Sequence, residues 1–254
     1  MVASTIKAKT TVGKAQPPPI DAPSPSRPGA NGHRIIYPES DGKPMADNTK
    51  QYEYIVTIQG GIARLFDGRN DVFVAGDLLW YPVEGDNTLR VAPDVLVAFG
   101  RPLGHRGSYK QWLEGNIPPH VVFEVMSPGN TNAEMVRKQG FYQEYGVEEY
   151  YLYDPDRGSL RGWLRRGERL EKIRVMRDWV SPRLGIRFRL EGFDLVLYRP
   201  DGARFRTFLE VQRQEAAEHE RAEAATKQVE IEYVRRERLT IRLRELGIDL
   251  ATLE

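Results

Sequence analysis

The chain has 254 residues, of which 40% are hydrophobic and 29% charged, and its formal net charge is +1. It contains no apolar run of the roughly 20 residues that a membrane span needs and no apolar secretory signal, so we expect one folded domain with polar extensions, a cytoplasmic location and no membrane contact. The absence of cysteine excludes disulfides, thiolate metal sites and a cysteine nucleophile, and the small net charge gives no sign of a strongly basic nucleic-acid binder.

Residues 1–45 differ in composition from the rest of the chain. The stretch KAQPPPIDAPSPSRPGANG is rich in Pro, Ser, Ala and Gly. Such a segment buries too little apolar surface to offset its ordering entropy, so we expect a disordered tail. A transit peptide is the alternative, because the first residues, MVASTIKAKTTVGK, are basic and contain no acid. The folded domain is expected over residues 46–205.

A helix is predicted at the start of this domain, in MADNTKQYEYIVTIQGGIARLF. Asp47, Asn48 or Thr49 can cap its N-terminus. Gly60 and Gly61 are expected to end or interrupt it. Its expected apolar face consists of Tyr52, Ile55, Val56 and Ile58.

Three apolar runs follow as predicted strands, in DVFVAGDLLWYPVEG, LRVAPDVLVAFG and VVFEVM. A helix is then predicted from near Asn130 or Thr131 to Gly146, and EEYYLYDP is a fourth strand directly after it. A strand, a helix and a strand in so short a segment indicate a parallel crossover. The sequence therefore predicts an α/β fold with a mixed β-sheet flanked by helices, and shorter β segments that finish near Arg199.

Residues 206–254 are dense in Glu, Arg and Ala and predict a long charged helix. Apolar residues recur at spacings of three and four, but Glu232 and Arg236 interrupt the pattern. A short coiled coil, which would make the protein a homodimer, and a helix docked on the domain both remain open. The recurring positions are Ala222, Ala225, Val229, Leu239, Leu243 and Leu246.

Two of the apolar runs carry a carboxylate where a hydrophobic residue is expected. Asp94 stands in APDVLVAFG and Glu124 in HVVFEVMSPGNT. A buried carboxylate is costly without a partner, and two of them at one place suit a hard divalent cation such as Mg²⁺. The alternatives are a strand-entry aspartate that accepts backbone hydrogen bonds and a glutamate in a structural ion pair. Asp77, in VAGDLLWYP, is a possible additional acid.

The predicted helix after Glu124 directs a lysine inward. At 100° per residue, Lys138 falls in the middle of an arc whose other members are apolar or aromatic and include Tyr142. A desolvated ammonium needs an anion, either the carboxylates of the preceding strand or a bound phosphate. Two acids, a cation and a lysine would together suit phosphodiester hydrolysis. The alternative is an ordinary ion pair with Glu134, one helical turn earlier.

These residues resemble a known superfamily of nucleases. Pro93 and Asp94, followed by an acid in a later hydrophobic strand, are similar to the PD-(D/E)XK motif. GDLLWYPVEG, RVAPDVLVAFG, VVFEVMSPGNT and KQGFYQEYGVEEYYLYDPDRGSL look like the bacterial Uma-type restriction endonuclease domains, over about residues 45–205. The resemblance implies a restriction-endonuclease-like sheet flanked by helices, DNA as substrate and Mg²⁺ or Mn²⁺ as cofactor.

Carried over by position, Asp94 and Glu124 match the two acids of the motif, and Val125 is added as a metal ligand. Met126 stands where the superfamily places its lysine, so the resemblance implies that the lysine has moved to Lys138. The superfamily often adds a glutamate from a helix. Glu53, in the first predicted helix, is the candidate for that role. Asp77 and Tyr142 are further candidates for the site.

The polar loop RPLGHRGSYKQW combines cations with aromatic residues, the mixture that contacts phosphates and stacks on bases. An ordinary surface loop has the same composition. Its candidate nucleic-acid contacts are Arg101, His105, Arg106 and Lys110. The sequence thus predicts a Mg²⁺-dependent endonuclease that cuts DNA. The rival is a binding or scaffold module that oligomerises through its C-terminal helix, and a carboxylate-pair glycosidase is a third hypothesis that leaves the inward lysine without a role.

Overall fold

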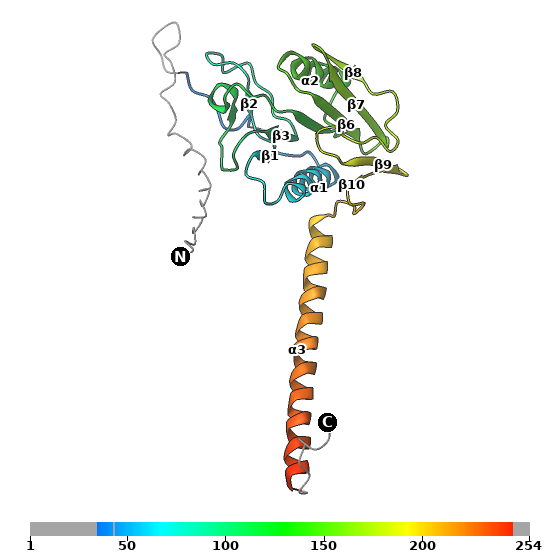
Figure 1. Ribbon diagram of the computed structural model, residues 1–254. Coiled ribbons are helices and arrows are strands. Elements are labelled where there is room, and N and C mark those ends of the chain that lie inside the picture. The colour runs from blue at the N-terminus through cyan, green and yellow to red at the C-terminus, as the bar shows by residue number, and fades with distance from the viewer. Residues whose placement is uncertain (1–34, 43, 246–254) are drawn as a thin grey trace, which may run out of the picture.

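The computed structural model describes residues 35–42 and 44–245 of the chain (Figure 1). Its helices are α1 (Thr49–Leu65), α2 (Asn132–Glu144) and α3 (Phe208–Glu245), with a short 3-10 helix η1 (Gln111–Glu114). Its strands are β1 (Val72–Gly76), β2 (Trp80–Tyr81), β3 (Val95–Phe99), β4 (Tyr109–Lys110), β5 (Val121–Val125), β6 (Glu149–Asp154), β7 (Ser159–Arg166), β8 (Arg169–Lys172), β9 (Arg187–Glu191) and β10 (Asp194–Tyr198).

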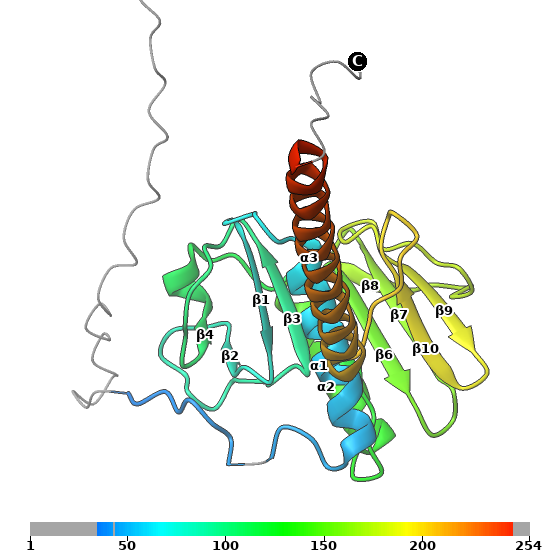
Figure 2. The same ribbon diagram turned by 90° about the horizontal axis from the view of Figure 1, so that it is seen from below.

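The domain is built on a mixed six-stranded sheet in the order β1-β3-β5-β6-β7-β8. β5 and β6 are parallel and are joined through α2, whereas the other neighbouring strands are antiparallel. Two small sheets, β10-β9 and β2-β4, lie beside it. Figure 2 shows neighbouring strands of the main sheet side by side. The predicted parallel crossover and mixed α/β sheet are confirmed.

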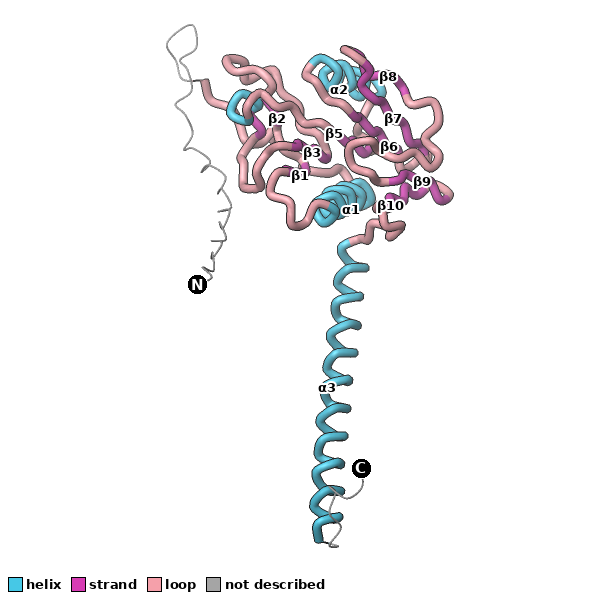
Figure 3. The backbone as a smooth tube through the Cα atoms, viewed as in Figure 1, coloured by secondary structure: helices cyan, strands magenta, loops and turns pink. Residues whose placement is uncertain are grey.

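Each face of the main sheet is covered by one helix, as Figure 3 shows. On one face, α1 and the β9–β10 sheet pack on the odd-numbered residues of β3 and β5, such as Val97 and Phe123. On the other face, α2 packs on the even-numbered residues, such as Leu96 and Val122. Since side chains alternate along a strand, the parity of a residue decides which helix it meets. The acids Asp94 and Glu124 have the parity of the α2 face.

The first helix runs through the two glycines that were expected to stop it. Asn48 caps α1 by accepting a hydrogen bond from the Gln51 N–H at 2.8 Å, as predicted. The helix nevertheless continues to Leu65. A Cβ at Gly61 would overlap the ring of Phe205, so the absent side chain makes room for a residue far along the chain. The expected apolar face was partly wrong, because Tyr52 is exposed; the buried row is Gln51, Ile55, Ile58 and Ile62.

Replacing Gly61 with alanine should therefore destabilise the domain, although alanine is the better helix former. We expect a loss of about 1–3 kcal/mol from overpacking against Phe205. Gly60→Ala is the matched control, because a Cβ there meets nothing within 4 Å and should stabilise the helix by roughly 0.5–1 kcal/mol. Urea denaturation of both variants measures the contrast. Equal stabilisation by both substitutions would show that the packing of Phe205 does not require glycine at position 61.

The ordered domain begins before residue 46, where composition placed its start. Tyr37 packs against Tyr81 and Trp112, with ring centroids 5.1 Å and 5.0 Å apart. The Tyr81 hydroxyl donates to the Pro38 carbonyl at 2.7 Å. Residues 35–42 are thus part of the packed structure. The remainder of the predicted tail, residues 1–34, lies outside the described residues.

The C-terminal helix extends away from the domain (Figure 1). α3 has 38 residues, and none of them is buried. This confirms the predicted long charged helix over residues 208–245, whereas residues 246–254 lie outside the described part of the chain. Within residues 35–42 and 44–245, no helix combines the length and the apolar character that crossing a bilayer requires.

Candidate active site

Three carboxylates line up across three neighbouring strands on the α2 face. Val95 pairs with Phe123 and with Gly76, so the same registers place Asp94 opposite both Glu124 and Asp77. The Asp77 N–H donates to the Asp94 carbonyl at 3.2 Å, which continues the ladder by one residue. Residues opposite one another in a sheet share a face. The fold therefore brings together two acids predicted for the site and the possible third.

Helix α2 supplies the cation that faces this row. Lys138 Nζ lies 2.8 Å from Glu124 Oε2 and donates to the Ala92 carbonyl at 3.3 Å. The Tyr142 hydroxyl donates to the other oxygen of Glu124. The Glu124 side chain is only 3% exposed and that of Lys138 19%. The predicted inward direction of Lys138 is confirmed, and the ion pair shown is with Glu124 rather than with Glu134.

Asp94 is held by the backbone of the strand that carries Glu124. Its Oδ2 accepts a hydrogen bond from the Val125 N–H at 2.6 Å. Burial, and then the neighbouring Glu124 charge, hold the pKa of Asp94 well above its ordinary value, against the opposing effect of Lys138. Burial likewise raises the pKa of Asp77, and Asp41 and Glu124 add to the rise. Both shifts favour the protonated, neutral forms of Asp94 and Asp77 in the absence of a cation.

Glu124 and Lys138 form a buried ion pair, and each charge favours the ionised form of the other residue. Burial raises the pKa of Glu124, although Lys138 and the Tyr142 hydroxyl favour the carboxylate. Burial alone would lower the pKa of Lys138, but the charges of Glu124 and Asp94 outweigh it and raise this pKa. Lys138 is therefore a protonated ammonium at neutral pH, paired with the Glu124 carboxylate.

The raised pKa of Asp94 predicts a pH-dependent stability of the metal-free protein. Because the folded state holds the Asp94 proton at pH values where the unfolded state has lost it, this residue stabilises the fold below its ordinary pKa. That contribution is lost as pH rises from the ordinary value of 3.8 through the raised one. Asp94→Asn should therefore flatten the decline of stability with pH and be more stable than wild type at the upper end.

Urea denaturation from about pH 4 to about pH 8 measures this difference. Asp67→Asn, at an exposed position, is the matched control and should follow wild type. Parallel curves for Asp94→Asn and wild type would contradict the assignment of a raised pKa to Asp94.

The donor set of this row fits a magnesium or manganese ion. Mg²⁺ is usually bound by one or two carboxylates with water completing its shell, and Asp94 and Glu124 supply two. A cation would also favour the ionised forms of the two carboxyl groups, whose pKa values are raised first by burial and then by neighbouring acids. The Val125 carbonyl already accepts from Gln51 Nε2 at 2.8 Å, so only its second lone pair is left for a metal. Among residues 35–42 and 44–245, no three acidic or imidazole side chains form a metal cluster by themselves.

The structure does not bring every predicted residue to this row. Glu53 is exposed on α1, which covers the opposite face of the sheet. In the polar loop, Arg101 and Arg106 both pair with Glu114, at 2.8 Å and 2.6 Å, and the Arg106 side chain is only 8% exposed. A buried triad of this kind accounts for both arginines without a nucleic acid. His105 is exposed in the same loop.

Three polar residues near the row were missed from sequence. Gln51 holds the Val125 carbonyl, and Tyr150 and Arg161 lie on the α2 face. Two of them had a signal in the sequence. Gln51 continues the i, i+4, i+7 spacing of the buried isoleucines of α1, and Arg161 has the strand parity of the buried Trp163.

Comparisons with known proteins identify the family of this chain. No match was found among curated proteins. One similar solved structure is a "putative nuclease belonging to DUF820" from Anabaena variabilis ATCC 29413; it has 16% identity and a TM-score of 0.42, and the alignment covers 55% of this chain and 74% of that chain. A family model described as "Putative restriction endonuclease" matches residues 42–197, which is more than half of the chain. The protein therefore belongs to the Uma2 family.

Proposed function

We propose that this protein is a metal-dependent endonuclease that hydrolyses phosphodiester bonds of DNA. The observation that carries the proposal is the placement of Asp94 opposite Glu124, with the Lys138 ammonium 2.8 Å from Glu124. Membership of the Uma2 family supports nuclease chemistry, and the choice of DNA follows from the restriction endonuclease description of that family.

Asp94 and Glu124 would hold Mg²⁺ or Mn²⁺, with the second lone pair of the Val125 carbonyl as a further donor. A divalent cation bound there would lower the pKa of a water molecule and offset the charge of the phosphate. The Val125 N–H fixes the carboxylate of Asp94, and the Tyr142 hydroxyl fixes that of Glu124. Both acids are thereby oriented before substrate arrives, which is the arrangement that makes electrostatic catalysis effective.

Lys138 has a separate role in this proposal. Its ammonium is held by Glu124 and the Ala92 carbonyl, so it is fixed next to the acids and remains protonated. When a phosphate enters, the ammonium can donate a hydrogen bond to a non-bridging oxygen. Charge grows on these oxygens as water adds to phosphorus, and a fixed cation stabilises it more strongly in a site that excludes water.

DNA contacts outside the row are proposed for His105 and Lys110. Both lie in the polar loop, and Lys110 sits over the ring of Tyr37 with its Nζ 5.5 Å from the ring centroid. Arg101 and Arg106, predicted as contacts from sequence, are given no such role here because they are paired with Glu114.

The test is cleavage of supercoiled plasmid, single-stranded DNA and single-stranded RNA by the full chain. We expect cleavage of DNA with Mg²⁺ or Mn²⁺ and none with EDTA. Cleavage of RNA alone would keep the chemistry but overturn the substrate, and no cleavage of any of the three would overturn the proposal.

The second candidate function is that of a scaffold, in which the nuclease fold serves only as a binding module. One observation favours it: α3 has 38 residues, and none of them is buried on its own domain. Titration of Mn²⁺ into the full chain separates the two candidates. Binding that disappears in Glu124→Gln favours the nuclease, and self-association without metal binding favours the scaffold.

A further inference from the structure

Two buried polar atoms on the α2 face lack a hydrogen-bond partner. They are the Tyr150 hydroxyl and Arg161 Nε, two of the three buried side-chain atoms without a partner among residues 35–42 and 44–245. Tyr150 is 0% exposed. A buried donor without an acceptor is rare in native structures and calls for a bound water, ion or ligand.

Both atoms lie near the row of carboxylates formed by Asp77, Asp94 and Glu124. Leu152 pairs with Glu124 on one side and with Arg161 on the other, so Arg161 continues the same row by two strands. Its Nη2 lies 3.6 Å from the sulfur of Met126, the residue two positions after Glu124. The Tyr150 hydroxyl lies within electrostatic reach of Glu124, Arg161 and Asp94.

The chemistry of the two groups indicates the class of ligand. A guanidinium has only donors, in a planar fork that matches the oxygens of phosphate, and a phenol can donate one more hydrogen bond. The nearby acids would repel an anion bound on its own. They would tolerate one whose charge is shared with a cation, as in a nucleic-acid backbone at a metal site.

We propose that Arg161 and Tyr150 form a phosphate subsite that binds the nucleic-acid backbone next to the bond being cut. This inference rests on the proposed nuclease function. Arg161 is here a binding residue: it takes no part in proton transfer, and its loss should weaken substrate binding more than it slows the chemical step.

The variant that tests the subsite is Arg161→Met, which keeps the length of the side chain and removes its charge and donors. Arg166→Met on the same strand is the matched control, since Arg166 is exposed and pairs with Glu171 at 3.6 Å. The probe is a labelled DNA duplex, bound with Ca²⁺ in place of Mg²⁺ and titrated with salt. Arg161→Met should bind about tenfold more weakly, with a salt dependence reduced by about one phosphate contact.

Cleavage kinetics separate the subsite from the nuclease proposal. With Mg²⁺, Arg161→Met should raise KM with kcat nearly unchanged, and Tyr150→Phe should shift KM in the same direction by less. If wild type cleaves and Arg161→Met binds as Arg166→Met does, the two atoms hold only water and the subsite is overturned. If wild type does not cleave but Arg161→Met still binds DNA more weakly, the subsite stands and the nuclease proposal fails. Thermal melts confirm that the variants are folded.

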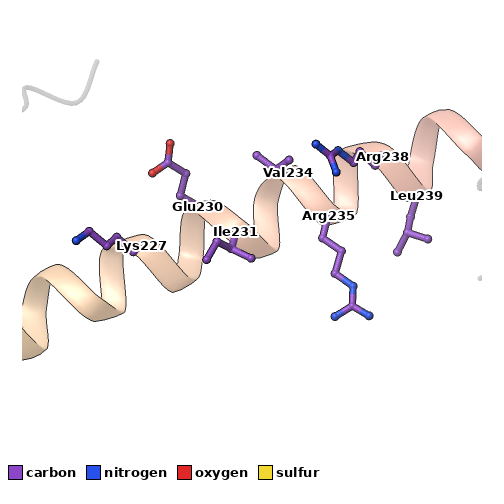
Figure 4. A pocket seen from close by; sticks show the side chains of 7 residues that line it. All are labelled: Lys227, Glu230, Ile231, Val234, Arg235, Arg238 and Leu239. Carbon is purple, nitrogen blue, oxygen red and sulfur yellow. The ribbon is translucent and has the colours of Figure 1, made fainter.

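A different observation carries a second inference, which does not depend on the nuclease. α3 presents large apolar side chains to solvent along its C-terminal half; those at least 40% exposed are Val229, Ile231, Tyr233, Val234, Leu239 and Ile241. Figure 4 shows part of this surface, a groove lined by side chains from successive turns of the helix. Apolar residues on an unsupported helix indicate a partner.

Charge and size along α3 indicate what that partner is. Residues 208–226 carry five glutamates and two arginines, a net charge of −3, and residues 227–245 carry six basic residues and four glutamates, a net charge of +2. A second copy in the antiparallel direction sets each acidic half against a basic half. It also sets the large apolar residues between positions 229 and 234 against the alanine-rich stretch 216–225, and large-on-small contacts pack closely. A parallel copy would set like charge on like charge.

We propose that α3 pairs with α3 of a second copy of this chain in the antiparallel direction. The pair would be a rod about 57 Å long with one domain toward each end. With the two helices aligned end to end, Gln212 of one copy lies beside Ile241 of the other, and helical spacing puts both positions on the face toward the partner.

The orientation can be read by disulfide trapping, because the chain has no cysteine of its own. Gln212→Cys and Ile241→Cys are made separately in the full chain, mixed and oxidised. The antiparallel pair predicts the mixed disulfide, whereas disulfides within each variant alone would show a parallel pair and overturn the proposal.

The mass of the untreated protein gives an independent check. Light scattering should show a dimer for wild type and for the control Gln228→Glu, which lies on the side of α3 away from the partner, and a monomer for the double variant Ile231→Glu with Val234→Glu. A monomeric wild type would overturn the pairing, as would a double variant that stays dimeric.

Discussion

Replacing Asp94 with asparagine should abolish DNA cleavage while the domain stays folded. Asparagine can still accept the hydrogen bond that Asp94 takes from the Val125 N–H, so the connection between the two strands is kept. What is lost is one of two charged donors for the cation, and we expect the cleavage rate to fall at least about 10²-fold. The measurement is nicking of supercoiled plasmid under Mg²⁺ or Mn²⁺.

Asp71→Asn is the matched control for this experiment. Asp71 also carries a carboxylate next to a strand of the sheet, but its side chain is 51% exposed and pairs with Arg69. It should cleave at the wild-type rate. If Asp94→Asn and Asp71→Asn both cleave as wild type does, Asp94 has no part in the chemistry.

Replacing Lys138 with methionine should impair both activity and stability. Removing one member of a buried ion pair leaves an uncompensated charge, here Glu124 at 3% exposure, and we expect a loss of about 3 kcal/mol in unfolding free energy near pH 8. Cleavage should fall about 10²-fold, since the fixed cation for the phosphate is gone. Urea denaturation and plasmid nicking measure the two effects.

The two effects can be separated by a second substitution. Adding Glu124→Gln to Lys138→Met removes the unpaired charge and should recover much of the stability without recovering cleavage. Lys50→Met is the surface control, because Lys50 pairs with Asp156 at 3.5 Å with both side chains well exposed, and it should change stability by less than about 1 kcal/mol. A stable Lys138→Met that cleaves normally would contradict the assigned role of Lys138.

The residues of this site that could be predicted from the sequence are those that local periodicity marks. Lys138 lies in the middle of an apolar arc, and helical spacing is enough to direct it inward. Asp94 and Glu124 interrupt runs of strand residues, which marks them as buried acids. That they lie directly opposite each other depends on the register between β3 and β5, which the sequence of either strand alone does not state.

The parts that failed depended on contacts between distant segments. α1 continues through Gly61, where a side chain has no room because the ring of Phe205, far along the chain, occupies that space. Arg101 and Arg106 turn toward Glu114, in a loop where no periodicity shows which way a side chain points. Arg161 was overlooked although strand parity places it with Trp163, because an arginine in a polar strand is usually read as exposed.

The central claim is that Asp94 and Glu124 share one divalent cation, and titration of Mn²⁺ into the metal-free full chain tests it most directly. The account predicts about one ion bound per chain, with binding lost in both Asp94→Asn and Glu124→Gln and kept in Asp71→Asn. Binding of wild-type strength in either site variant would contradict it.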